Sequence, residues 1–83
     1  MLNIKILGSG CAKCKRLEQV TRKAVDQQGL AAEFEMVTSM EEIMKWPILS
    51  TPGLVIQNEL VSSGKIPTEA EVAQWIEAAV RAS

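Results

Sequence analysis

The chain has 83 residues, 47% of them hydrophobic, which fits one domain with a single modest core and excludes a disordered chain. Its formal net charge of −1 argues against a nucleic-acid-binding protein, which would be basic overall. No apolar run approaches the roughly 20 residues of a membrane span, and no charged segment precedes the first apolar stretch as in a signal peptide. We therefore expect one cytoplasmic domain over residues 1–83, monomeric and without a membrane partner.

The hydrophobic pattern predicts strands and helices in the order β-α-β-α-β-β-α. In chain order the elements are strand 2–7, a helix from Cys11 that ends before Gly29, strand 32–37, a short helix from residue 40 that Pro47 stops, strand 54–56, strand 60–61 and a helix from Thr68 to Val80. A helix joins the first two strands, so we expect them to be parallel. The last two strands form a hairpin, and the whole predicts an α/β fold: a four-stranded mixed sheet with helices on both faces.

Several local signals support these elements. The first helix has an apolar face at helical spacing. The second strand alternates with Glu33 and Glu35, which predicts an edge strand with one wet face. Asn58 can take the left-handed conformation of a hairpin turn. Thr68 and Glu71 have the spacing of a capping box, in which each residue's side chain satisfies the other's backbone N–H group.

The only two cysteines, Cys11 and Cys14, stand three residues apart where the first helix begins. The start of a helix offers unsatisfied N–H groups and the positive end of the helix dipole, and both favour a thiolate. One helical turn also brings two cysteines within reach of a disulfide. The outer thiolate can attack a disulfide, and the inner one can resolve the mixed disulfide that results.

Other uses of this pair stay open. A structural staple over so short a loop would remove little unfolded-state entropy. Zinc needs four ligands, and the chain has no histidine and no second cysteine pair to supply them. A copper carrier of the ferredoxin-like class also has a Cys-x-x-Cys motif after its first strand, but with Met where this chain has Ser9, and it ends in a strand. The sequence favours a redox role for this pair, and a carrier of a soft metal (copper or zinc) is the alternative.

A second motif, "STPG" from Ser50 to Gly53, enters the third predicted strand. Together with the element order and the cysteine pair, it makes the chain resemble the thioredoxin–glutaredoxin superfamily. More narrowly, the chain resembles the small thioredoxin-like redox-active disulfide proteins of bacteria and archaea. The stretches "IKILGSGCAKC", "TPGLVI" and "VSSGKIPTEAEVAQWI" carry this resemblance, which covers essentially the whole chain.

The resemblance implies a thiol–disulfide oxidoreductase that needs no cofactor and binds no metal in its site. Cys11 is then the nucleophile and Cys14 the resolving cysteine. A cis proline at Pro52 faces them, and Thr51 offers its backbone to the substrate chain. Three further residues around the cysteines complete the expected substrate contacts: Gly10, Ala12 and Lys13.

The resemblance implies partners as well as a site. They are a disulfide-bearing protein or a small-molecule disulfide, and an upstream reductase that returns electrons. The chain departs from thioredoxins and glutaredoxins in the residues between the cysteines, and its first strand has no acidic residue. A thioredoxin-fold binding module without catalysis is the remaining alternative.

Two residue groups outside the motifs also matter. The methionines Met1, Met36, Met40 and Met44 lie at ordinary core spacing, which predicts that they fill gaps in the core. Residues 1–28 have an excess of four positive charges, while the remainder has an excess of five negative charges. The basic excess surrounds the cysteines and is either a solvated face or a surface that steers acidic partners.

Overall fold

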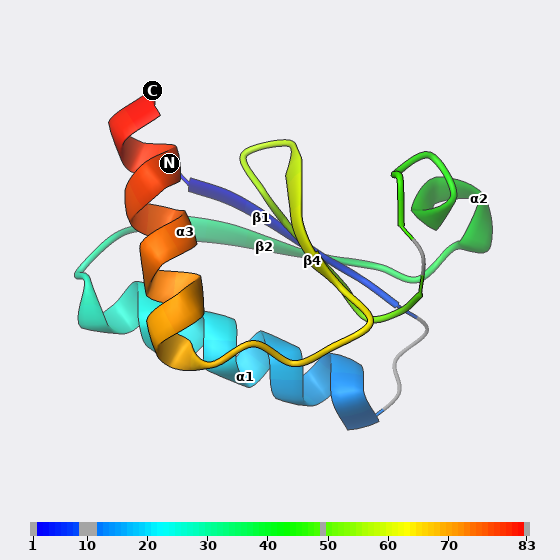
Figure 1. The fold of residues 1–83 in the computed structure, drawn as a ribbon, viewed down its shortest axis with the longest axis horizontal. Coiled ribbons are helices and arrows are strands. Elements are labelled where there is room, and N and C mark those ends of the chain that lie inside the picture. Colours follow the sequence, from blue (N-terminus) through cyan, green and yellow to red (C-terminus); the bar gives the residue numbers. More distant parts are fainter. Residues whose placement is uncertain (1, 9–11, 49, 83) are drawn as a thin grey trace.

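A computed structural model describes residues 2–8, 12–48 and 50–82 of the chain (Figure 1). Its elements follow the predicted order: β1 (Leu2–Leu7), α1 (Ala12–Gln27), β2 (Ala32–Val37), α2 (Met40–Ile43), β3 (Gly53–Ile56), β4 (Glu59–Ser63) and α3 (Glu69–Ala82). No helix in these ranges is both long and apolar enough to cross a membrane.

The four strands form one mixed sheet in the spatial order β2-β1-β3-β4. β1 and β2 are parallel, as a helical crossover requires, while β1 and β3 are antiparallel. β3 and β4 form the predicted hairpin, whose two-residue turn has positive φ at both Gln57 (52°) and Asn58 (65°). Positive φ at both turn positions matches the twist of the flanking strands. β2 lies at a sheet edge with Glu33 and Glu35 exposed, as predicted.

Two helices, α1 and α3, cover one face of the sheet (Figure 1). Alternate residues of the strands point to them, because side chains along a strand alternate between the two faces. The cluster between helices and sheet consists of Leu2, Ile4, Ile6, Leu17, Ala24, Val25, Leu54, Ile56, Val72 and Ile76. Burying one such Leu, Ile or Val side chain contributes about 1.5–3 kcal/mol, so this layer holds the helices in place.

The other face carries a smaller cluster of Leu7, Val37, Ile43 and Val55, and Ile43 brings α2 to it. Helices therefore lie on both faces, as predicted. The prediction that the methionines fill the core is wrong for the three that the structure describes. Met36, Met40 and Met44 are 36%, 63% and 74% exposed, and Met1 lies outside the described residues. The single turn of α2 turns only Ile43 toward the sheet.

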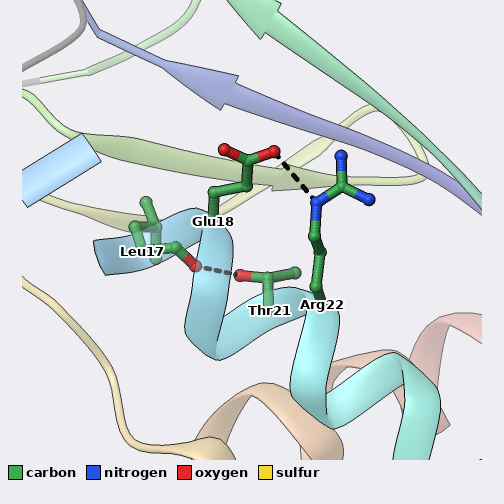
Figure 2. A network of polar contacts seen from close by, with 4 residues as sticks. All are labelled: Leu17, Glu18, Thr21 and Arg22. Atoms are coloured by element: carbon green, nitrogen blue, oxygen red, sulfur yellow. Dashed lines mark hydrogen bonds and ion pairs between the residues drawn. The ribbon is translucent and has the colours of Figure 1, made fainter. Parts of the chain in front are cut away.

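Local hydrogen bonds support the long helices. The Thr21 hydroxyl is buried in α1 and donates to the Leu17 carbonyl at 2.8 Å, which satisfies it inside the core (Figure 2). The predicted capping box forms at the start of α3. There the Glu71 N–H donates to Thr68 Oγ1 at 3.2 Å, and the Thr68 N–H donates to Glu71 Oε1 at 3.1 Å. At the start of α2, by contrast, Ser39 makes no side-chain capping bond.

Candidate functional site

Cys14 lies where the chain has passed from the central strand β1 into α1. β1 ends at Leu7 and α1 begins at Ala12, so the fold places Cys14 at one end of the sheet (Figure 1). Cys14 is in the first turn of α1 and is 0% exposed, on the same buried face as Leu17. The sequence predicted a resolving cysteine, and the structure shows its side chain wholly enclosed. Cys11 and Gly10, two of the predicted site residues, lie outside the described residues.

Gly8 makes room for the Cys14 sulfur. A Cβ atom added at Gly8 would overlap Cys14 Sγ and would come within 3.9 Å of Pro52 Cα. Gly8 is itself buried, and its N–H group donates to the Val37 carbonyl at 2.9 Å, which fixes its backbone to β2. The sulfur of Cys14 and the backbone of Pro52 thus converge on the same α-carbon, which has no side chain.

The Thr51–Pro52 peptide bond is cis, as the resemblance implied. Pro52 is buried, and its carbonyl accepts a hydrogen bond of 2.8 Å from the Gly64 N–H group. Gly64 has a φ of +76°, and a Cβ atom there would overlap Ser50 Oγ. The segment before β3 is therefore held against the end of β4, beside Cys14.

Thr51 lies at the surface next to this buried proline. Within the part of the chain that the structure describes, neither its N–H nor its C=O group forms a hydrogen bond. Backbone groups that the fold leaves unpaired at the surface can pair with another extended chain.

The two residues between the cysteines, Ala12 and Lys13, are exposed. With Lys15, Arg16 and Gln19 of α1 and Ile66 of the β4–α3 connection, they line a surface pocket of ≈ 340 Å³. The structure thus brings Cys14 and Pro52 together, sets Thr51 beside Pro52, and puts Ala12 and Lys13 on an adjoining surface.

The sequence did not single out three residues of this region: Gly8, Gly64 and Ile66. A glycine after a strand, such as Gly8 or Gly64, indicates only that the strand ends, and the neighbours Pro52 and Ser50 come from distant parts of the chain. No signal in one sequence marks which glycine faces a thiol. Among residues 2–8, 12–48 and 50–82, no group of three or more His, Cys, Asp or Glu side chains is placed to hold a metal ion.

Comparisons with known proteins agree with this geometry. A family model described as a thioredoxin domain matches residues 2–77. The chain belongs to this thioredoxin family. It is 38% identical over 72 residues to a thioredoxin of Methanothermobacter thermautotrophicus, covering 87% of this chain and 94% of that protein. It is 39% identical over 72 residues to a thioredoxin of Methanocaldococcus jannaschii, covering 87% of this chain and 83% of that one.

Membership of the family gives the class of activity. Thioredoxins are thiol–disulfide oxidoreductases that act on disulfide-bearing substrates and receive electrons from a reductase. This chain is an enzyme of that class.

Proposed function

We propose that Cys11 is the nucleophile of this thioredoxin-like oxidoreductase and that Cys14 resolves the mixed disulfide. The observation that carries the proposal is the complete burial of Cys14, whose sulfur lies against Gly8 on the side where Pro52 also approaches, while Cys11 stands three residues earlier in the sequence. A buried thiol cannot meet a protein substrate first, but it can reach a sulfur one turn away. The division of roles follows from this difference in access.

The exchange proceeds in two balanced steps. The Cys11 thiolate attacks one sulfur of the substrate disulfide, whose S–S bond breaks as a bond to Cys11 forms, and the departing thiolate takes a proton from water. The Cys14 thiol then loses its proton to water and attacks the Cys11 sulfur, the bond between Cys11 and the substrate breaks, and the second substrate sulfur leaves as a thiolate that takes a proton from water. The substrate gains two electrons and two protons: the cysteine pair gives up the two electrons and the Cys14 proton as it becomes a disulfide, and water supplies the proton that Cys11 lost on forming its thiolate. A reductase or a dithiol restores the pair.

In this proposal the substrate chain binds at the surface beside the cysteines, along the backbone of Thr51. The N–H and C=O groups of Thr51, which form no hydrogen bond among the described residues, pair with an extended substrate chain beside the buried Pro52. Gly10, Ala12 and Lys13 complete the contact surface around Cys11. The substrate in this proposal is a protein or small-molecule disulfide. The enzyme acts as a monomeric single domain in the cytoplasm, with no membrane or nucleic-acid partner.

The experiment measures thiols, metal and turnover on one preparation. After mild oxidation the reduced protein should lose two thiols, stay monomeric and regain both thiols with a dithiol. It should also catalyse reduction of insulin disulfides by that dithiol, and a Cys11→Ala variant should not. Copper or zinc bound stoichiometrically through purification under reducing conditions would support the carrier alternative. Two reversible thiols without turnover on insulin or a small disulfide would support the non-catalytic binding module.

A further inference from the structure

The charges of α1 divide into two halves that differ in pairing. In the C-terminal half, Arg22 pairs with Glu18 at 2.9 Å and Lys23 with Glu69 at 3.8 Å (Figure 2 shows the first pair). In the N-terminal half, three cations form no ion pair with any residue that the structure describes: Lys13, Lys15 and Arg16. The acid nearest to them in the sequence, Glu18, is already engaged by Arg22.

These unpaired cations line a pocket. Lys13, Lys15 and Arg16 are exposed and lie around the ≈ 340 Å³ pocket whose other walls are Ala12, Gln19 and Ile66. None of the described residues that line it is acidic. The pocket begins at Ala12, the residue after Cys11, so whatever occupies it adjoins the cysteine motif. The positive end of the α1 dipole has the same sign as these charges.

Glu18 is engaged by Arg22, and the acids of α2 lie on the far side of the sheet from these cations. Glu41 and Glu42 belong to α2, which covers the opposite face of the sheet from α1 (Figure 1). The net charge of −1 therefore hides a positive surface on the α1 side of the motif. An approaching partner meets three cations around this pocket, while Glu18 and Glu69 are paired with Arg22 and Lys23. Opposite charges across an interface set both orientation and encounter rate.

We infer that the pocket of Lys13, Lys15, Arg16 and Ile66 docks an acidic segment of the protein whose disulfide the cysteine pair reduces. This inference rests on the proposed function and adds the chemical class of its partner. The carboxylates of the segment pair with the three cations, and the methylene groups of its side chains lie against Ile66. Docking there raises the rate of exchange for acidic protein disulfides over neutral ones.

The test uses the full chain and two synthetic peptide disulfides. They share one sequence, except that the residues flanking the disulfide are aspartates in one and serines in the other. The measured quantity is the ratio of the two second-order reduction rates, which cancels any change in thiol reactivity itself. The test variant is K15Q/R16Q, and the matched control is R22Q/K23Q, which removes the same charge from the same helix. K23Q/R81Q is a second control that spares the contact of Arg22 with Phe34.

For the unmodified protein at low salt we expect an aspartate-to-serine ratio of about two- to tenfold, falling toward one at about 0.5 M salt. K15Q/R16Q should lose at least half of that preference, whereas both controls, checked as folded by circular dichroism, should keep it. Equal rates for both peptides, or equal losses in test and control variants, would overturn the inference. If the unmodified protein reduces the serine peptide without preferring the aspartate peptide, only the docking inference fails. If it reduces neither peptide, the proposed function fails and the inference with it.

Discussion

Replacing Gly8 with alanine perturbs the site at one defined contact. The added Cβ atom would overlap Cys14 Sγ, while its next neighbours, Cys14 Cβ at 3.6 Å and Pro52 Cα at 3.9 Å, are at ordinary contact distances. Overpacking a closed site of this kind costs about 1–3 kcal/mol in the free energy of unfolding. The cost should therefore come almost wholly from the Cys14 sulfur.

A double-mutant cycle isolates that contact. C14A removes the sulfur and alone should cost about 1 kcal/mol, since it leaves a small void. In the C14A background, G8A should cost at least about 1 kcal/mol less than in the unmodified chain, because the added methyl group then enters the vacated space. Urea unfolding under reducing conditions measures all four free energies without a disulfide in any of them.

Gly29→Ala supplies the control for glycine replacement as such. Gly29 has a φ of +66° and nothing within 4 Å of an added Cβ atom, so its cost of about 1–2 kcal/mol is a backbone cost. It should be the same with and without the Cys14 sulfur. If G8A and C14A were additive within about 0.5 kcal/mol, the sulfur would not lie against Gly8 as described.

Three further outcomes follow from burial and capping. Limiting alkylation near neutral pH should label Cys11 well ahead of Cys14, which is 0% exposed, and comparable rates in mass spectrometry would contradict the assigned roles. Thr68→Ala should cost about 1 kcal/mol in urea unfolding through loss of the α3 cap, while Thr68→Ser should not, and equal stabilities would show that the cap contributes nothing. With the thiols blocked, dilute peroxide should oxidise Met44, which is 74% exposed, ahead of Met36, which is 36% exposed. Peptide mapping measures the order of oxidation, and the reverse order would contradict the placement of α2.

The sequence predicted the elements and their order well, because each is encoded locally. Periodicity gave the buried face of α1, and glutamates alternating with apolar residues placed β2 at an edge. The capping box at Thr68 formed as predicted, since its partners lie within one helical turn. β4 continues to Ser63, beyond the predicted end at Val61, because its pairing with β3 does not depend on hydrophobicity.

The features that the sequence did not predict depend on contacts between segments that are distant along the chain. Met40 and Met44 share core spacing with Ile43, and only the position of α2 on the sheet determines which of the three is buried. The place of Gly8 beside Cys14 and Pro52 could not be predicted, because Pro52 is far from both along the chain. The complete burial of Cys14 has the same origin, because Pro52, which approaches the same α-carbon of Gly8 as the Cys14 sulfur, comes from a distant segment.

Trapping of a mixed disulfide tests the central claim most directly. The C14A variant, mixed with a peptide disulfide near neutral pH, should accumulate one peptide on Cys11, because the thiol that would release it is gone. The unmodified protein should accumulate none, and C11A should react slowly because its remaining thiol is buried. Intact-mass spectrometry with peptide mapping identifies the modified cysteine. An adduct on Cys14 of C11A forming as fast as that on Cys11 of C14A, or no adduct on C14A, would contradict the assignment of Cys11 as nucleophile and Cys14 as resolving cysteine.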